Sequence, residues 1–419
     1  MTTTFADLGV PSSLVDALAR REITVPSPIQ AATLPDSLAG RDVLGRGRTG
    51  SGKTFAFLLP LVAHLTANPQ PAGSKRPRAL ILAPTRELVT QIEESLQALT
   101  SGTRITSRVV FGGVGQGPQV EALRRGVDVV IACPGRLEDL MGQGHVNLGD
   151  VEVTILDEAD HMADLGFLPG VKRILDTTPR TGQRMLFSAT LDAGVDVLAK
   201  RYLTKPVTHE ADSEQSPVET MEHHVLVVRG DDHMAVLSDL TAAPGRTIVF
   251  ARTKHRTKKF AKQLNALGVP AVELHGNLSQ GARTRTMDAF HSGAATTLVA
   301  TDIAARGIHV DDVSLVIHAD PPAEHKAYLH RSGRTARAGS AGTVVTLMTP
   351  DQGSDVRTLM NRAGITATRT DVRPGHPRLT ELAPGERTYA DPASLATLAS
   401  APAQEAPAGG GGRRRSGGG

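Results

Sequence analysis

Cysteine, tryptophan and aromatic residues in general are scarce in this sequence. Its 419 residues include one cysteine, no tryptophan and 3% aromatic residues. A single cysteine excludes an intramolecular disulfide framework and zinc modules built from several cysteines, and it favours a reducing compartment. The shortage of aromatic rings argues against a protein that binds nucleic acid mainly by stacking bases.

An excess of charge of either sign is also missing. The chain has 46 Lys plus Arg and 43 Asp plus Glu, which gives a formal net charge of +3. This balance excludes a polybasic protein held to nucleic acid by bulk electrostatics. The length exceeds that of one ordinary domain, and a hydrophobic content of 40% can bury substantial cores, so two or three globular domains are expected.

Long hydrophobic runs are absent as well. The longest, residues 55–65, is about half the roughly 20 residues that a membrane-spanning helix needs, and Pro60 and His64 interrupt it. Residues 1–10 lack the basic and apolar segments of a secretory signal. A cytoplasmic location is therefore expected.

Short apolar runs alternate with helical patterns in the first half of the chain. The runs expected to form strands are 42–45, 79–83, 108–111, 128–132, 153–156 and 184–187. They are apolar on both faces, as buried parallel strands are. Between them, Leu88, Ile92, Leu96 and Leu99 have helical spacing. This alternation predicts an α/β domain with a doubly wound parallel sheet over residues 1–208.

The same pattern restarts after a polar break. Residues 209–220 have no apolar periodicity and are expected to form a linker. The strands expected beyond it are 225–228, 247–250, 271–274, 297–300, 315–317 and 343–347. They predict a second α/β domain over residues 221–370. Residues 371–419 are rich in Pro, Ala and Gly and end in GGGGRRRSGGG, so a disordered tail is expected there.

One stretch is locally basic. Residues 252–262 read RTKHRTKKFAK and contain no acidic residue. One interpretation is a solvated helix face, with Phe260, Leu264 and Leu267 pointing inward. The other is a surface that contacts phosphates. The sequence does not decide between them.

A phosphate-binding loop is predicted at residues 47–54. They read GRTGSGKT, fit the pattern GxxxxGK[ST], and lie between an expected strand and an apolar helical pattern. Glycines let backbone N–H groups turn toward a triphosphate, and the helix N-terminus adds its positive end. Lys53 can reach the outer phosphates, and the Thr54 hydroxyl can bind Mg²⁺. A glycine-rich turn without function is the alternative, which the flanking strand and helix disfavour.

Acidic residues follow a buried strand at residues 157–160. The apolar run 153–156 leads directly into Asp157, Glu158, Ala159 and Asp160. Carboxyl ends of parallel strands face the crevice where α/β sheets bind ligands. Asp157 is therefore the expected Mg²⁺ partner, and Glu158 the expected base that orients water. Taken alone, such acids are more often helix caps, but beside a phosphate loop the functional interpretation is favoured.

Three arginines at spacings of three lie in the second domain, at residues 331, 334 and 337. On a helix, this spacing places side chains on one face. An arginine that reaches across a cleft can stabilise the charge of phosphoryl transfer when two domains close. A surface cluster paired with carboxylates is the alternative.

Taken together, the sequence resembles the DEAD-box RNA helicase family. In the first domain the strings that carry the resemblance are PSPIQ at 26–30, GRTGSGKT at 47–54, PTREL at 84–88, GG at 112–113, PGR at 134–136, DEAD at 157–160 and SAT at 188–190. In the second domain they are VF at 249–250, HG at 275–276, Gln280 with Arg283, TD at 301–302, ARG at 305–307 and HRSGRTAR at 330–337. This ordered set covers about residues 5–350 and is far more specific than any single string.

The resemblance implies two tandem RecA-like domains that bind ATP, Mg²⁺ and RNA, with residues 3–31 as the adenine-recognition segment. Implied nucleotide contacts are Phe5, Ile23, Gln30, Gly47, Arg48, Thr49, Gly50, Ser51, Gly52, Lys53, Thr54, Gly307, Arg334 and Arg337. Implied metal ligands are Thr54 and Asp157. Catalytic roles are implied for Lys53, Asp157, Glu158 and the finger arginines Arg334 and Arg337.

The resemblance also implies residues that couple the two ligands. Coupling of ATP state to domain closure is implied for Asp160, Ser188, Thr190 and His330. Contacts to the RNA sugar–phosphate backbone are implied for Pro84, Thr85, Arg86, Gly112, Gly113, Gly135, Arg136, Arg283, Thr301 and Asp302. Such contacts predict binding that does not depend on RNA sequence.

Three features depart from the family pattern. Ile23, after Glu22, stands where an aromatic residue usually follows glycine, and the lost stacking on adenine is worth about 1 kcal/mol. His309 stands where an acid usually contacts the ribose, and Cys133 stands where threonine is usual. These departures predict a change in nucleotide affinity and base selectivity rather than in chemistry.

Three functions fit the motifs. The favoured one is an RNA-dependent ATPase that unwinds short duplexes. An ATP-gated RNA clamp or ribonucleoprotein scaffold without strand separation would use the same motifs, and a DNA helicase or other P-loop ATPase is the generic alternative. The tail at 409–419 is either a solubilising linker or an added electrostatic RNA contact. The RNA target, protein partners and oligomeric state are not encoded in recognisable motifs.

Overall fold

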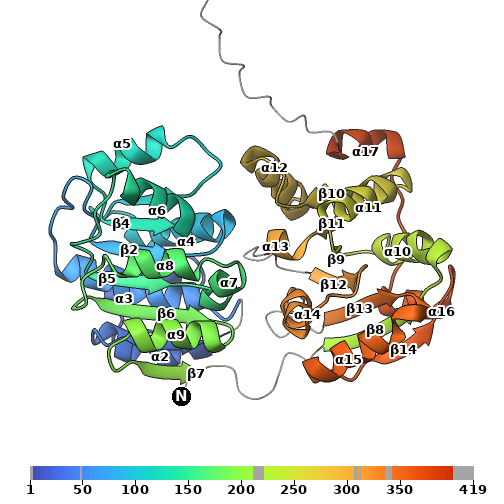
Figure 1. The fold of residues 1–419 in the computed structure, drawn as a ribbon, viewed down its shortest axis with the longest axis horizontal. Helices are drawn as coiled ribbons and strands as arrows, with labels where there is room; N and C mark the ends of the chain where they lie inside the picture. The colour runs from blue at the N-terminus through green and yellow to red at the C-terminus, as the bar shows by residue number, and fades with distance from the viewer. Residues whose placement is uncertain are drawn as a thin grey trace, which may run out of the picture.

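Two α/β units make up the described part of the chain (Figure 1). The structure is a computed structural model that describes residues 3–47, 50–210, 221–305, 310, 313–335 and 342–399. In the described residues, each unit holds a seven-stranded sheet. All strand pairings recorded in the two sheets are parallel. The predicted α/β fold with two parallel-sheet domains is therefore confirmed.

The first sheet has the strand order β3-β4-β2-β5-β6-β1-β7. Its strands are β1 (Val43–Arg46), β2 (Ala79–Leu82), β3 (Ser107–Val110), β4 (Val129–Ala132), β5 (Val153–Leu156), β6 (Gln183–Ser188) and β7 (Val207–Glu210). The helices of this domain are α1 (Ser12–Ala19), α2 (Pro28–Leu38), α3 (Lys53–Ala67), α4 (Arg86–Thr100), α5 (Gly117–Arg125), α6 (Pro134–Gly142), α7 (Ala159–Asp164), α8 (Leu168–Leu175) and α9 (Ala193–Tyr202).

The second sheet has the order β10-β11-β9-β12-β13-β8-β14. When its strands are numbered from the start of the domain, this order is the same as in the first sheet. Its strands are β8 (Met221–Val227), β9 (Arg246–Phe250), β10 (Ala271–Leu274), β11 (Thr297–Ala300), β12 (Val313–His318), β13 (Gly342–Met348) and β14 (Thr368–Asp371). Its helices are η2 (Gly230–Asp232), α10 (His233–Thr241), α11 (Lys254–Ala266), α12 (Gln280–His291), α13 (Asp302–Ala305), α14 (His325–Ser332), η3 (Pro350–Gln352), α15 (Gly353–Ala363), α16 (Pro377–Leu382) and α17 (Pro392–Ala399).

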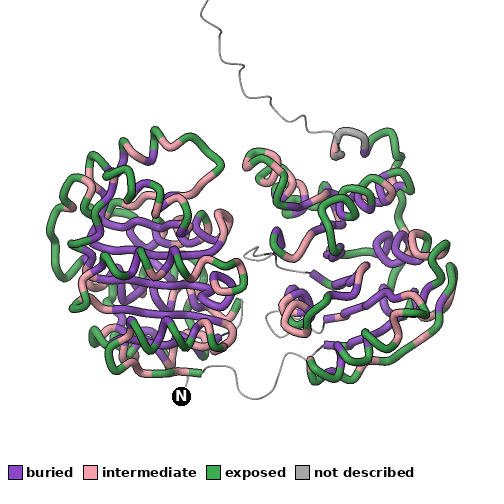
Figure 2. The backbone as a smooth tube through the Cα atoms, in the orientation of Figure 1, coloured by how far each residue is buried: buried purple, intermediate pink, exposed green. Residues whose placement is uncertain are grey.

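The cores lie on both faces of each sheet. Central strands such as β2, β4 and β5 are buried along their whole length (Figure 2). Helices cover the two faces, so each domain has two apolar clusters separated by its sheet. This burial explains why the strands read as continuous apolar runs rather than as alternating ones.

The register of the first sheet aligns the strand ends that carry the motifs. β1 pairs with β6 so that Arg46 is level with Ser188, and β5 pairs with β6 so that Leu156 is level with Leu186. The loops that follow β1, β5 and β6 therefore leave the same edge of the sheet. The phosphate loop, the acidic residues and the SAT string are brought together at this edge.

Two strands were not predicted from the sequence. Each lies at one edge of its sheet, β7 in the first and β14 in the second; β7 has exposed residues on one face and β14 on both. Their mixed polarity hides them from a search for buried apolar runs. The predicted linker was also too long, because His209 and Glu210 pair with β1 in β7. Residues 211–220, the rest of the predicted linker, lie outside the described residues.

The prediction of a disordered tail from residue 371 is wrong for residues 371–399. Val372, Leu379 and Leu382 are buried in the core of the second domain, and Leu379 is 0% exposed. α16 contacts α10, and α17 contacts α11 and β10. A few well-spaced apolar residues are enough to fix this segment, although its overall composition is rich in Pro and Ala. Residues 400–419 lie outside the described part of the chain.

The basic stretch forms most of α11. Phe260 and Leu264 are buried as predicted, but Leu267 is 48% exposed, so the prediction for Leu267 is wrong. Leu267 is the C-cap residue, where the helical periodicity that oriented it inward ends. Lys258 and Lys259 are exposed, as expected for a solvated helix face. Within the described ranges, no helix is both long enough and apolar enough to span a membrane.

Candidate nucleotide and RNA site

The phosphate loop connects β1 to α3 in the backbone geometry that the motif requires. Gly50 and Gly52 have φ values of 86° and 92°, which a residue with a Cβ rarely adopts. Lys53 begins α3, is buried, and donates a hydrogen bond from Nζ to the Gly47 carbonyl at 2.6 Å. The predicted contacts Arg48 and Thr49 lie outside the described residues.

Gln30 connects the upstream segment to this loop. Its Nε2 donates to the Gly52 carbonyl at 2.9 Å, and its Oε1 accepts from the Ser27 N–H at 2.9 Å. A Cβ on Gly52 would lie 2.6 Å from the Gln30 Nε2, so only glycine leaves room for this contact. The structure thus places Gln30 against the phosphate loop, while its contact with adenine stays a prediction.

The two other residues predicted to hold the nucleotide base differ from each other. Phe5 is 1% exposed and belongs to the hydrophobic core of the first domain, so its ring presents no open face to a ligand. The contact of Phe5 with a nucleotide stays a prediction. Ile23 is partly buried and packs against the same core, which leaves part of its side chain accessible.

The carboxylates after β5 are buried behind the loop. Asp157 is 2% exposed and accepts a hydrogen bond from the Glu158 N–H at 3.0 Å. Glu158 adopts a left-handed backbone with φ of 51°, a conformation that L-residues seldom occupy. Its Oε2 lies 3.0 Å from Nδ1 of His161, one helical turn further on. His161 was not predicted as a functional residue.

The surroundings of Asp157 and Glu158 shift the pKa values of the two carboxyl groups in opposite directions. Burial, opposed only in part by the charge of Lys53, raises the pKa of Asp157 to about 7. Burial alone would also raise the pKa of Glu158. The hydrogen bond and charge of His161, with the charges of Lys53 and Arg334, outweigh burial and lower the pKa of Glu158 to about 2. Such a pair, with pKa values driven apart, is typical of a catalytic site.

Asp160 joins the acidic string to the SAT string. Its Oδ2 accepts hydrogen bonds from the Thr190 N–H at 2.9 Å and from the Thr190 hydroxyl at 3.0 Å. The Asp160 N–H donates to the Ser188 hydroxyl at 3.2 Å. Three of the four predicted coupling residues are therefore in direct contact, at the shared edge of the sheet.

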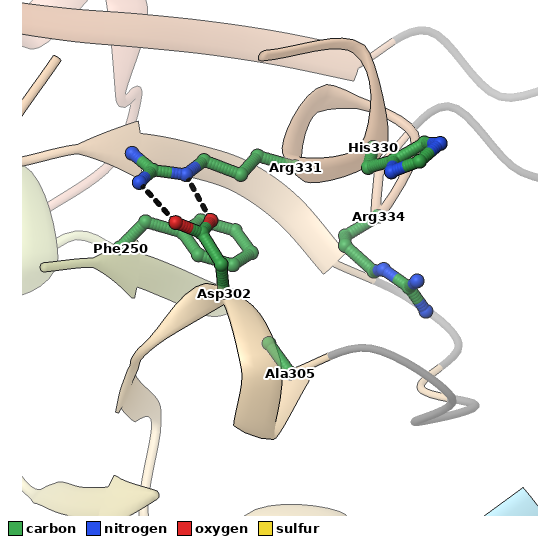
Figure 3. Close-up of a pocket in the computed structure, with 6 residues that line it drawn as sticks. All are labelled: Phe250, Asp302, Ala305, His330, Arg331 and Arg334. Carbon is green, nitrogen blue, oxygen red and sulfur yellow. Dashed lines mark hydrogen bonds and ion pairs between the residues drawn. The ribbon is translucent and has the colours of Figure 1, made fainter. Parts of the chain in front are cut away.

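The fourth coupling residue, His330, lies on α14 in the second domain. It lines a small cavity together with Phe250, Asp302, Ala305, Arg331 and Arg334. In Figure 3, Arg331 is directed at Asp302, whereas His330 and Arg334 are directed away from that ion pair. The expectation that the arginines share one helix face is wrong, because α14 ends at Ser332 and Arg334 follows it. Arg337 and Gly307 lie outside the described residues.

Arg331 binds within its own domain. Its Nε and Nη2 donate to the two carboxylate oxygens of Asp302 at 2.5 and 2.8 Å, and its Nη1 donates to the Asp320 carbonyl at 2.8 Å. The guanidinium also lies over the Phe250 ring. A buried, bidentate arginine of this kind fixes α14. Asp302, predicted to touch RNA, is thus already engaged by Arg331.

Several predicted RNA contacts gather at the start of α4. Pro84 precedes the helix, and the Thr85 hydroxyl caps it by accepting from the Leu88 N–H at 3.3 Å. Gly113 has a φ of 77°, and a Cβ there would lie 2.3 Å from the Arg86 guanidinium. Glycine at this position therefore makes room for the arginine.

The remaining predicted RNA residues are spread over three loops. Gly112 precedes Gly113, Gly135 lies in the first turn of α6, and Thr301 directly precedes α13. The Arg136 guanidinium donates to the Val114 carbonyl at 3.3 Å, which connects α6 to the loop that contains Gly112. The contacts of these residues with RNA stay a prediction.

Contacts between the two domains involve two of the predicted RNA arginines. Arg86 donates to the side chain of Gln280 at 3.1 Å, and Arg283 pairs with Glu87 at 2.7 Å. The Arg283 and Glu87 side chains are only 12% and 14% exposed. A further salt bridge, between Lys326 and Asp192, has no counterpart among the predictions. The structure thus places the PTREL string of the first domain in contact with Gln280 and Arg283 of the second domain.

The site has features that fit a nucleotide and a divalent cation. The buried hydroxyl of Ser51 has no hydrogen-bond partner among the described residues. A Cβ on Gly47 would lie 2.7 Å from that hydroxyl oxygen, so only glycine leaves room for Ser51 at this point of the loop. Within the described ranges, no cluster of three or more His, Cys, Asp or Glu side chains forms a metal site. Oxygen donors from Thr54 and Asp157 suit Mg²⁺, which commonly uses few protein ligands together with phosphates.

Comparison with known proteins agrees with this arrangement. The DEAD/DEAH box helicase family model matches residues 27–198, and the helicase conserved C-terminal domain matches residues 232–339. The ATP-dependent RNA helicase RhlB of Pseudomonas syringae pv. tomato is 39% identical over 369 residues, covering 86% of this chain and 93% of the relative. The chloroplastic DEAD-box ATP-dependent RNA helicase 3A of Zea mays is 41% identical over 367 residues, covering 86% of this chain.

This chain spans about half the length of the maize relative, at 49%. Among solved structures, S. cerevisiae Dbp5 bound to RNA and ADP BeF3 superimposes with a TM-score of 0.76 at 28% sequence identity. That match covers 88% of this chain and 95% of Dbp5. The two sheets therefore correspond to the tandem RecA-like domains of such helicases, and the chain belongs to the DEAD-box ATP-dependent RNA helicase family.

Proposed function

We propose that this chain hydrolyses ATP in response to RNA and uses domain closure to separate short RNA duplexes locally. The observation that carries this proposal is the contact between the two domains at the motifs, where Arg283 pairs with Glu87 at 2.7 Å and Arg86 donates to Gln280 at 3.1 Å. The charge of Arg334 in the second domain also helps to lower the pKa of Glu158 in the first. A site completed by both domains makes hydrolysis depend on closure. RNA bound across the same cleft would then favour the closed arrangement.

Nucleotide binding rests on the loop between β1 and α3. The backbone of residues 50–54 and Lys53 would hold the phosphates, and Gln30 would contact adenine. Thr54 and Asp157 would hold Mg²⁺, which neutralises phosphate charge when bound. The Lys53 ammonium has three N–H donors and uses one of them for the Gly47 carbonyl, so the others would be available to the phosphates.

Water activation rests on Glu158. Its low pKa keeps the carboxylate ionised across the physiological range, so it can accept a hydrogen bond from an attacking water. His161 fixes the position of that carboxylate through Oε2. Arg334 supplies positive charge opposite, where negative charge develops during phosphoryl transfer.

RNA as the partner is supported by the relatives. The matched Dbp5 structure holds RNA together with ADP BeF3, and the RhlB relative is described as an RNA helicase. Arg86, Arg283 and the glycine pair at 112–113 form the surface that would contact the sugar–phosphate backbone. A backbone-reading surface needs neither aromatic platforms nor a large net charge.

A strand-displacement assay tests the proposal. We expect release of a short RNA duplex strand with ATP, and loss of both release and hydrolysis, by about 100-fold or more, in Lys53→Ala. Lys200→Ala, a substitution of an exposed lysine on α9, should behave as wild type. Hydrolysis and RNA binding without strand release would instead indicate an ATP-gated clamp. We further propose a cytoplasmic setting, supported by the presence of a single cysteine.

A further inference from the structure

One salt bridge joins the domains at a place where the sequence shows no recognised motif. Lys326 Nζ lies 3.0 Å from Asp192 Oδ2. Lys326 belongs to the first turn of α14 in the second domain, and Asp192 is the residue before α9 in the first. Their side chains are 39% and 21% exposed, so the pair is partly shielded from water.

Both ends of this bridge are fixed by their own domains. Asp192 Oδ1 accepts hydrogen bonds from the N–H groups of Gly194 and Val195 at 2.9 and 3.1 Å, which makes it the cap of α9. α14 is anchored by the fully buried Tyr328 and by the bidentate pair of Arg331. A bridge between ordered elements loses less conformational entropy than one between mobile side chains.

Lys326 lies near three aspartates of the first domain, Asp192, Asp164 and Asp160. Its hydrogen bond to Asp192, with the more distant charges of Asp164 and Asp160, raises the pKa of Lys326. Asp160 is the carboxylate that binds Thr190. A cation from the second domain therefore lies close to the residues predicted to couple ATP state to closure.

We propose that Lys326 is a positioning residue whose salt bridge with Asp192 holds α14 against the coupling residues when the domains close. This inference rests on the proposed function. Chain continuity carries the effect to the site, since α14 leads directly to Arg334, whose charge reaches Glu158. Lys326 acts through α14 and not on the reacting atoms, so it contributes to closure rather than to the chemical step.

The bridge differs from the interdomain contacts of Arg86 and Arg283. Those contacts use Arg86 and Arg283, which the sequence predicts to bind RNA and which RNA would therefore engage. The Lys326–Asp192 pair involves no predicted RNA contact. It can persist in the RNA-bound closed state and stabilise that state.

A double-mutant cycle tests the inference. Lys326→Gln removes the cation, and Asp192→Asn removes the anion while keeping a good helix cap. The readouts are kcat and the concentration of a single-stranded oligouridylate that half-saturates ATP hydrolysis. We expect each single variant to raise that concentration about three- to fivefold with kcat unchanged. The double variant should be no worse than either single, because both remove the same interaction.

Matched controls separate positioning from general destabilisation. Lys200→Gln breaks a salt bridge with Asp196 inside α9 and should change neither readout. Lys326→Arg keeps the positive charge and should have the same half-saturating RNA concentration as the wild type. The melting temperatures of all these variants should equal that of the wild type. Additive effects in the cycle, or a half-saturating RNA concentration that no variant moves, would overturn the inference.

A second measurement covers the case in which RNA does not stimulate the wild-type enzyme. That result would contradict the proposed function. The fraction of closed molecules would then be measured by fluorescence energy transfer between the two domains, in the presence of a non-hydrolysable ATP analogue and oligouridylate. We expect a smaller closed fraction in Lys326→Gln than in wild type. An equal closed fraction in both would overturn the inference independently of catalysis.

Discussion

At Asp157, the requirements of the site and those of folding conflict. The carboxylate is buried, and burial raises its pKa to about 7 from the ordinary value of 3.8. The folded state therefore binds a proton more tightly than the unfolded state does. The stabilisation from this proton is complete below about pH 4 and is lost as the pH rises toward 7. Neutral pH lies close to this pKa, so the Asp157 carboxyl is only partly ionised there, and its ionised form is a buried charge.

Asp157→Asn should therefore stabilise the nucleotide-free protein while abolishing hydrolysis. We expect a gain of about 1 kcal/mol or more at pH 8, which corresponds to about 2–4 °C in melting temperature. The gain should be smaller at pH 5.5, where the wild-type carboxyl is already protonated in the folded state. Calorimetry at both pH values measures it. Asp150→Asn, at an exposed carboxylate, is the control, and a lower melting temperature of Asp157→Asn at both pH values contradicts this account.

His161→Ala should raise the pKa of Glu158. Without the hydrogen bond to Oε2, burial dominates and favours the protonated carboxyl. The rise should be about one to two pH units, measured as the pH midpoint of the Glu158 carboxyl signal in carbon-13 NMR. His209→Ala, which removes a histidine paired with Asp36 elsewhere in the first domain, should leave that midpoint unchanged. A midpoint that stays in place in His161→Ala would show that His161 does not hold Glu158.

Strand ends and motif spacing predicted where the candidate site residues lie better than they predicted the partners of those residues. Residues 50–54, Asp157 and Glu158 lie at the strand ends where the sequence predicts them. The contact of Asp160 with Thr190 was not predicted. His161 was missed, although its i,i+3 spacing from Glu158 was visible in the sequence. The burial of Phe5 in the core was not predicted, because the sequence motif does not record tertiary packing. The pairing of Asp302 with Arg331 depends on tertiary packing, which no local pattern records.

At the scale of single elements, strands with a continuous apolar run were predictable, and polar edge strands were not. The runs at 153–156, 271–274 and 297–300 coincide with β5, β10 and β11, although β10 lies at the edge of its sheet. β7 and β14 lack the continuous apolar character that identified the others, because β7 is exposed on one face and β14 on both. α14 was expected to continue through Arg334, but Gly333 is its C-cap residue. Glycine is a common helix terminator, so this boundary was readable from the sequence.

The segment after β14 provides a test at this scale. Leu379 on α16 is fully buried, so Leu379→Ala should destabilise the second domain by about 2–5 kcal/mol. Urea unfolding measures the change. Leu267→Ala, at an exposed leucine, should alter the free energy of unfolding by no more than about 0.5 kcal/mol. Equal effects of the two substitutions would mean that residues 371–399 do not belong to the domain core.

At the scale of the whole molecule, the two-domain arrangement followed from the repeated strand pattern. The contacts between the domains did not follow from it, because residues such as Glu87 and Arg283 are far apart in the chain and carry no shared local signal. The near-neutral net charge agrees with a small number of specific contacts across the cleft. It predicts weak RNA binding in the open state and sequence-independent binding in the closed one.

The most direct test of the account is RNA-stimulated ATP hydrolysis by wild type beside Glu158→Gln. We predict slow hydrolysis without RNA and strong stimulation by single-stranded RNA in the wild type. Glu158→Gln should lose hydrolysis by about 100-fold or more, since it removes the base, while it keeps ATP and RNA bound together. A rate that does not depend on RNA and is unchanged in Glu158→Gln would contradict the account.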